Sequence, residues 1–136
     1  MDATPPSPPA PAREATPVIA VVDDDQGIRT ALHSLLRSVG YRVRVFADAP
    51  SFLAEAARER PDCLVTDIQM PGMGGLELQR AVRARYPGLP VIIITAFPEE
   101  AIREQALADG ALHFFAKPFE TAAMLRCLAD AVGSAG

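Results

Sequence analysis

The chain has 136 residues, of which 49% are hydrophobic and 22% are charged. This composition fits one globular domain, and no apolar run approaches the roughly 20 residues that a membrane-spanning helix needs. A net charge of −4 at pH 7 lacks the basic surface typical of nucleic-acid binding, so neither DNA nor a membrane is an expected partner. Cys63 and Cys127 are far apart and no secretory leader is visible, which predicts a cytoplasmic protein with both cysteines in its core.

The two ends of the chain differ from its middle. Residues 1–17 hold six of the 13 prolines, separated mostly by Ala, Ser and Thr. Such a segment cannot bury enough apolar surface to offset its conformational entropy. We therefore predict a disordered Pro/Ala-rich tail over 1–17, one domain over 18–132, and a flexible C-terminus over 133–136.

The domain begins with a strand followed by a helix. Residues 18–22 are continuously apolar, as expected for a strand buried on both faces. Apolar residues then recur at helical spacing over 28–39, with Asp25 placed to cap the helix and Gly40 after its end. Residues 41–45 alternate apolar and basic side chains, which predicts an edge strand with one solvated face.

The middle of the chain continues the same alternation. A helix is predicted over 49–60 and a buried strand over 63–67. The loop at 71–75 is rich in Gly and Pro, and a helix is predicted after it over 76–86. The most apolar strand is expected at 89–95.

The last predicted elements complete an α/β domain. Pro98 is expected to begin a helix that ends near Asp109, followed by a strand over 112–116 and a helix over 119–132. Five strand–helix pairs in regular alternation require crossover connections between parallel strands. The sequence therefore predicts a flavodoxin-like, doubly wound parallel sheet with strand order 2-1-3-4-5.

Polar side chains stand at the carboxyl ends of four predicted strands. Asp23 and Asp24 follow the first strand, Asp67 and Thr95 end the third and fourth, and Lys117 follows the fifth. These strands are neighbours in the predicted order, so the five side chains converge on one crevice. Clustered carboxylates favour Mg²⁺, and an ammonium and a hydroxyl can hold phosphoryl oxygens. We predict a site for Mg²⁺ and a phosphoryl group.

Five short segments lie around these residues: VVDD at 21–24, DIQMPGMGG at 67–75, IIITA at 92–96, GA at 110–111 and KPF at 117–119. Together they resemble the receiver domain of two-component response regulators, and most of all its FixJ-like branch. The resemblance covers essentially all of the predicted domain. It implies a phosphorelay protein that is phosphorylated on an aspartate.

The resemblance also implies roles for the acidic residues. Asp67 would accept a phosphoryl group from a phosphohistidine of a sensor histidine kinase or phosphotransfer protein. Asp23, Asp24 and Asp67, with the backbone carbonyl of Gln69, would bind Mg²⁺. Asp24 would bind the ion directly and Asp23 through water.

Further implied roles concern the phosphoryl group and the switch. Thr95 and Lys117 would hold the phosphoryl oxygens, and the small side chain of Ala96 would leave the group room. Phe114 stands where the family places an aromatic residue that changes rotamer when Thr95 moves; as a Phe it has no hydroxyl to donate. A cis peptide between Lys117 and Pro118 is also implied.

A phosphoryl group held by Thr95 and Lys117 would bias the elements that border these residues. We expect the output surface on the helix predicted to begin at Pro98, the strand at 112–116 and the helix at 119–132. Its expected partner is a downstream protein, an output domain of a longer chain, or a second copy in a phosphorylation-dependent dimer. The surface includes Arg103, His113 and Phe114.

The lifetime of the phosphorylated state is expected to depend on two residues. Gln69 and Phe97 stand two positions after Asp67 and Thr95. Gln69 can orient an attacking water, whereas Phe97 has no polar group and can cover the phosphoryl group. We expect exclusion of water to dominate, which gives a comparatively long-lived phosphorylated state.

Other functions remain open on the residues alone. The acids at 23–25, a strand ending in Thr95 and the later Lys117 also fit the motif order of a haloacid-dehalogenase-type phosphohydrolase. That enzyme expects an acidic pair after the lysine, and here only the isolated Glu120 and Asp130 follow. A receiver-like adaptor that works without phosphorylation is a third reading. The leading hypothesis is a phosphorylation-switched binding module, not an enzyme that converts a metabolite, and it is either a single-domain regulator or a piece of a longer one.

Overall fold

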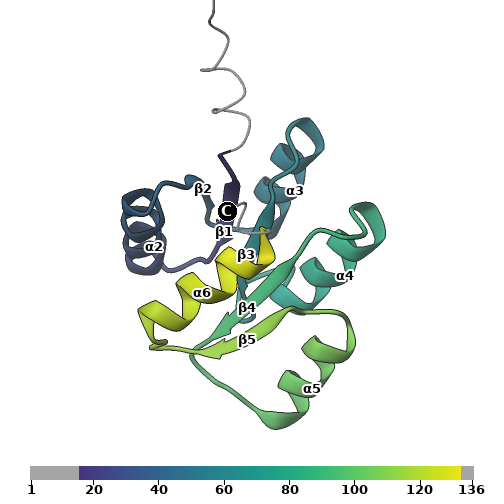
Figure 1. Ribbon diagram of the computed structural model, residues 1–136. Coiled ribbons are helices and arrows are strands. Elements are labelled where there is room, and N and C mark those ends of the chain that lie inside the picture. Colours follow the sequence, from purple (N-terminus) through teal and green to yellow (C-terminus); the bar gives the residue numbers. More distant parts are fainter. Residues whose placement is uncertain (1–15, 133–136) are drawn as a thin grey trace, which may run out of the picture.

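The computed structural model describes residues 16–132, which form five strands and five helices (Figure 1). Apart from its last two residues, the predicted tail over 1–17 lies outside the described residues, as does the predicted C-terminus over 133–136. Within the described part of the chain, every helix is too short or too polar to cross a membrane.

The strands form one parallel sheet in the order β2-β1-β3-β4-β5, which confirms the predicted flavodoxin-like topology. The register pairs Asp67 with Ile94 and Thr95 with Ala116. The polar residues that end β3 and β4, and the residue that follows β5, therefore reach the same edge of the sheet. The bounds are β1 Val18–Val22, β2 Arg42–Phe46, β3 Cys63–Asp67, β4 Val91–Thr95 and β5 His113–Ala116.

Helices cover both faces of the sheet, with α2 and α6 on one face and α3, α4 and α5 on the other (Figure 1). Alternate residues of the inner strands supply the two hydrophobic clusters between sheet and helices: Ile19 and Val21 pack toward α2 and α6, and Ala20 and Val22 toward the other face. Both cysteines are free and buried, as predicted. The helices are α2 Gln26–Ser38, α3 Ala49–Arg58, α4 Gly75–Arg85, α5 Glu100–Ala108 and α6 Thr121–Ala131.

The strand β2 lies at an edge of the sheet, as its alternating sequence predicts. All five of its residues are partly or fully exposed. Arg44 pairs with Glu55 and Glu59 near the end of α3. These ion pairs connect the edge strand to the helix that follows it.

Four predicted boundaries are wrong by two residues, and two of these are the end of α3 at Arg58 and the start of α6 at Thr121. The helix α5 begins at Glu100 rather than Pro98, because Glu99 has an extended backbone (φ −123°, ψ 139°) and is the N-cap residue. The strand β4 begins at Val91 rather than Leu89. Here the Leu89 amide turns back to the carbonyl of Tyr86 at 3.0 Å, and the next residue, a proline, has no N–H for a sheet hydrogen bond.

The Gly-rich loop holds α4 close to the end of β3. A Cβ on Gly75 would lie 2.1 Å from the carbonyl oxygen of Asp67 and 2.8 Å from Cα of Ile68. The Gly75 amide also donates a 3.0 Å hydrogen bond to the Ile68 carbonyl. Only glycine fits at this contact, which fixes the start of α4 against the loop that follows Asp67.

We predict that Gly75→Ala destabilises the protein by about 1–3 kcal/mol, because the added methyl group forces two backbone segments apart. Urea unfolding of the parent and variant measures the loss. Gly27→Ala is the control, since its Cβ meets one side-chain oxygen of Asp25 at 3.2 Å and no backbone of another segment. A Gly75→Ala protein as stable as the parent would show that the close approach is not required.

Candidate functional site

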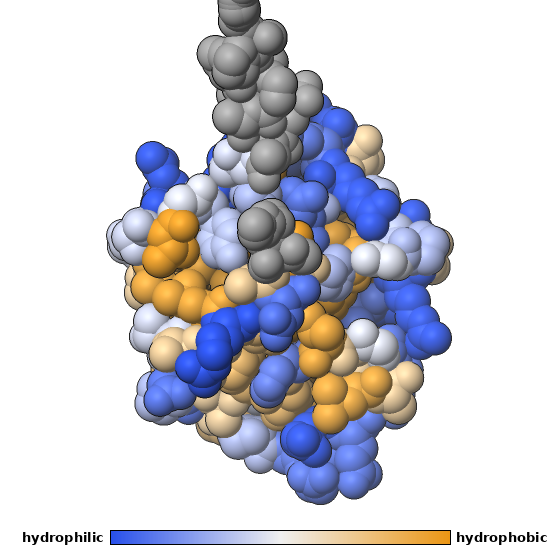
Figure 2. Space-filling model, viewed as in Figure 1, coloured by the Kyte–Doolittle hydropathy of each residue, from blue (hydrophilic) through white to orange (hydrophobic). Residues whose placement is uncertain are grey.

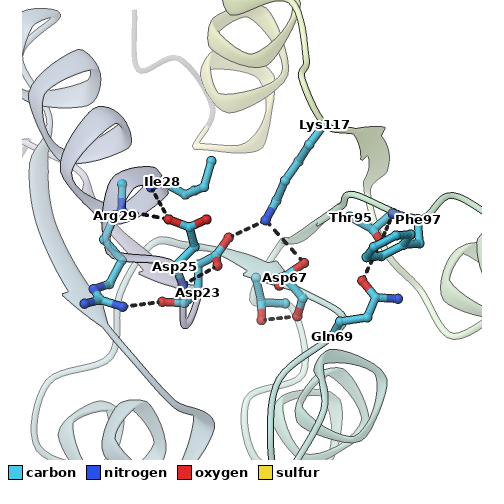
Figure 3. Close-up of polar contacts among 11 residues, drawn as sticks. Asp23, Asp25, Ile28, Arg29, Asp67, Gln69, Thr95, Phe97 and Lys117 are labelled. Carbon is cyan, nitrogen blue, oxygen red and sulfur yellow. Dashed lines mark hydrogen bonds and ion pairs between the residues drawn. The ribbon is translucent and has the colours of Figure 1, made fainter.

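Three of the predicted site residues meet in one ion-pair cluster (Figure 3). Lys117 Nζ lies 2.8 Å from Asp23 Oδ2 and 3.5 Å from Asp67 Oδ1. The lysine follows β5, and the two aspartates follow β1 and end β3. One ammonium therefore joins three strand ends, as their placement in the sequence predicts.

Asp23 is held on both its side chain and its backbone. Its carboxylate is fully buried, and Oδ1 accepts a 2.9 Å hydrogen bond from the backbone amide of Asp25. Arg29 Nη1 donates a 2.8 Å hydrogen bond to the Asp23 carbonyl. The contribution of Arg29 was not predicted, because an arginine on an amphipathic helix gives no sequence signal of a backbone partner.

Asp25 caps α2, as predicted, and does not join the cluster. Its Oδ1 accepts hydrogen bonds from the amides of Gly27 at 2.8 Å and Ile28 at 3.2 Å. Such a cap contributes about 1 kcal/mol to helix stability. Of the three consecutive acids, Asp23 and Asp24 remain available to the site.

The carboxylates of Asp23, Asp24 and Asp67 can hold a metal ion, because each offers an oxygen and these oxygens all lie within 4.8 Å of one another. Asp24 is exposed, and Asp67 is buried. Asp67 Oδ1 accepts no hydrogen bond from the described residues. An all-oxygen donor set with one solvent-facing carboxylate fits Mg²⁺, which keeps several waters when it binds.

The electrostatics of the cluster favour added positive charge. Burial raises the pKa of Asp67 and the charge of Asp23 raises it further, while Lys117 acts in the opposite direction. Burial disfavours the Lys117 ammonium, but its hydrogen bond to Asp23 and the charges of both aspartates outweigh burial, so the pKa of Lys117 is raised. One lysine does not offset the two buried acids.

Thr95 lies at the end of β4 and is fully buried. Its Oγ1 donates a 2.7 Å hydrogen bond to Gln69 Oε1 and accepts a 3.0 Å hydrogen bond from the Phe97 amide. Figure 3 shows the Phe97 ring beside Thr95 and the Gln69 side chain. The Gln69–Thr95 contact was missed, because the sequence suggested only a backbone carbonyl and a water-orienting amide for Gln69.

The remaining predicted residues lie around β5. Phe114 is partly buried and packs against the cluster on the α3, α4 and α5 face. Its amide donates a 3.0 Å hydrogen bond to Nδ1 of the exposed His113. The peptide between Lys117 and Pro118 is cis, as the family resemblance implied.

We predict that Asp67→Asn stabilises the folded protein at neutral pH, in the absence of divalent metal. A raised carboxyl pKa means that folding favours the protonated form, so ionised Asp67 lowers stability as the pH rises through the raised pKa. The gain from asparagine is expected to be absent below the usual carboxyl pKa of about 4 and complete above the raised pKa. Urea unfolding at several pH values measures it.

The exposed Asp130 provides the control for this experiment, because Asp130→Asn removes a charge from α6 far from the cluster. A pH-independent difference between Asp67→Asn and the parent would contradict the proposed cause. So would an equal gain in Asp130→Asn.

Comparison with known proteins identifies this arrangement. The family model described as the response regulator receiver domain matches residues 19–129. The chain is 36% identical over 115 residues to the response regulator protein TmoT of Ectopseudomonas mendocina, covering 85% of this chain and 52% of that protein. It is 34% identical over 117 residues to the transcriptional regulatory protein FixJ of Bradyrhizobium diazoefficiens, and the match covers 86% of this chain and 57% of that protein.

Comparison of the fold with solved structures points to the same family. A solved structure of the chemotaxis protein CheY4 of Vibrio cholerae superposes with a TM-score of 0.79 and 30% identity, covering 85% of this chain and 98% of that one. The chain spans about half the length of the curated relatives it matches. Because the family match covers all five strands apart from Val18, and every residue of the strand-end cluster, the chain belongs to the response regulator receiver domain family.

Proposed function

We propose that this domain is a phosphorylation-controlled switch of a two-component phosphorelay. Asp67 accepts the phosphoryl group from a phosphohistidine of a sensor histidine kinase or phosphotransfer protein. The observation that carries the proposal is the position of Lys117, which lies between Asp23 and Asp67 beside three clustered carboxylates. This arrangement supplies an acceptor oxygen, a fixed cation and metal ligands at one point.

The chemistry follows from these groups. An Asp67 carboxylate oxygen attacks phosphorus, the phosphorus–nitrogen bond of the donor breaks, and the imidazole leaves with the bonding electron pair. Lys117 offsets the negative charge of the phosphoryl oxygens, and the hydroxyl of Thr95 donates to one of them. Mg²⁺, when bound by Asp23, Asp24, Asp67 and the Gln69 carbonyl, would supply the additional charge neutralisation that phosphoryl transfer needs.

We predict that acetyl phosphate with Mg²⁺ adds about 80 Da to the intact protein and that Asp67→Asn abolishes the adduct. Asp67 is the buried acid that ends β3 and faces Lys117, and no other carboxylate in residues 16–132 has the same surroundings. Intact-protein mass spectrometry measures the adduct. An adduct of parental extent in Asp67→Asn would contradict the assignment of Asp67 as the phosphoryl acceptor.

The same reaction tests the metal. Excess chelator is expected to suppress the adduct. Asp24→Ala is expected to reduce it, because the substitution removes one of the proposed Mg²⁺ ligands. The exposed Asp24 carboxylate has no structural partner among the described residues, so the substitution disturbs no other contact. Asp25→Asn is the matched control, since asparagine also caps helices. Equal phosphorylation with and without chelator would contradict a role for Mg²⁺.

The proposed output surface comprises α5, β5 and α6, the elements that border Thr95 and Lys117. Leu107 on α5 and Leu112, which directly precedes β5, are 36% and 46% exposed. Figure 2, drawn from the side on which β5 and α6 face the viewer, shows hydrophobic residues in small groups between hydrophilic ones. The proposed partner is a downstream protein, an output domain of a longer chain, or a second copy of this domain.

We predict that phosphorylation shifts the amide resonances of Arg103, His113 and Phe114 more than those of α2 and α3. A phosphoryl group can bias this surface because it contacts Thr95 differently in the two states. Two-dimensional NMR spectra with and without phosphodonor measure the shifts. Shifts confined to α2 and α3 would refute this surface.

We predict that Phe97→Ala and Phe97→Glu both lose phosphate faster than the parent. The Phe97 side chain is 65% exposed beside Thr95, where it can cover a phosphoryl group on Asp67 and exclude the attacking water. A tenfold change in lifetime corresponds to about 1.4 kcal/mol of barrier, which one bulky ring can supply. The decay of the mass adduct after removal of phosphodonor gives the rates, and unchanged or slower loss in both variants would exclude shielding.

The proposal also covers location and ligands. We place the domain in the cytoplasm, since Cys63 and Cys127 are free. We assign it no metabolite as a substrate. We also assign it no direct nucleic-acid ligand, since its net charge is −4. Retention of duplex DNA by the isolated domain at physiological salt would contradict the last assignment.

A further inference from the structure

The one proton of the Thr95 hydroxyl is already used in a hydrogen bond in the unphosphorylated structure. It donates to Gln69 Oε1 at 2.7 Å and accepts from the Phe97 amide at 3.0 Å. A threonine hydroxyl carries a single proton, so it cannot donate to Gln69 and to a phosphoryl oxygen at the same time. Any phosphoryl contact by Thr95 therefore requires the bond to Gln69 to break first.

We propose that Gln69 is a positioning residue that holds Thr95 in its resting arrangement and competes with the phosphoryl group for the hydroxyl proton. The inference rests on the proposed function, because it takes the phosphoryl group on Asp67 as the competitor. It gives the Gln69 side chain a part in the switch equilibrium, separate from any effect on the lifetime of the phosphate.

The burial of the two partners decides what the exchange of acceptors requires. Gln69 is exposed, so water can satisfy its amide oxygen as soon as the bond breaks. Thr95 is fully buried, so its hydroxyl must find a new acceptor inside the site. A phosphoryl oxygen is such an acceptor. The Thr95 proton thus has an acceptor in both arrangements, and the charged phosphoryl oxygen is the stronger of the two, so phosphorylation can shift their populations.

The same hydroxyl connects Gln69 to the output surface. Thr95 Oγ1 accepts from the amide of Phe97, which lies in the segment 96–99 that leads into α5 at Glu100. If the Thr95 side chain turns toward Asp67, this amide loses its acceptor. The Phe97 amide resonance therefore reports on the position of Thr95 without any probe attached to the site.

The test uses beryllofluoride with Mg²⁺, a phosphoryl mimic that does not hydrolyse, so that binding is measured apart from phosphate loss. Gln69→Met keeps the side-chain length and removes the strong acceptor. We expect it to bind beryllofluoride roughly two- to tenfold more tightly than the parent, the change that corresponds to one neutral hydrogen bond. NMR titration of the Phe97 amide gives the affinities, and Gln69→Leu repeats the test with a different apolar side chain.

The control is Gln105→Met, the same chemical change on exposed α5, where Gln105 bonds only the surface residue Asp109. Its affinity is expected to match the parent. Parental binding with equal affinity in Gln69→Met and Gln69→Leu would overturn the competition and leave the proposed function intact. Failure of the parent to bind beryllofluoride would overturn the proposed function and the competition with it.

A second arm tests the contact without any phosphoryl mimic. Urea unfolding of the parent, Gln69→Met, Thr95→Val and the double variant forms a double-mutant cycle. We expect a coupling of about two- to tenfold in the unfolding equilibrium constant, with Gln69→Met nearly without effect once Thr95 is valine. Additive effects would overturn the contact on which the inference stands.

Discussion

The ammonium of Lys117 is the interaction on which the arrangement of the site depends. It reaches from the loop after β5 to Asp23 after β1 and Asp67 at the end of β3, and so crosses the edge of the sheet at which β4 also ends. Two buried carboxylates this close repel each other unless a cation lies between them. Without Lys117 the ends of β1 and β3 would hold uncompensated charge at the boundary of a hydrophobic core.

The fold explains why this charge lies at the strand ends. The inner strands are buried on both faces by α2 and α6 and by α3, α4 and α5. A polar side chain within these strands would lack water and partners, whereas at the carboxyl edge it meets loop amides and solvent. Asp23 accepts from the Asp25 amide and Arg29 donates to its carbonyl, so this fully buried acid has hydrogen-bond partners on both its side chain and its backbone.

Much of this could be predicted because it depends on patterns along the chain. The edge position of β2 followed from its alternation, and the convergence of Asp23, Asp67 and Lys117 followed from their places after neighbouring strands. The partners of individual side chains could not be predicted in the same way. The hydrogen bond from Thr95 to Gln69 depends on how two loops approach each other, and the spacing of residues along the sequence does not encode this. The start of α5 was misplaced because a proline fits the extended segment before a helix as well as the first turn of a helix.

The contact at Gly75 has a consequence for how the domain can move. The start of α4 lies against the backbone of Asp67 and Ile68 with no space for a side chain, and the Gly75 amide bonds the Ile68 carbonyl. The acceptor strand and α4 are thus expected to behave as one rigid body. Motion that begins at Asp67 is then expected to displace the neighbouring strands rather than α4, so that α5, beyond β4, moves relative to a stationary α4.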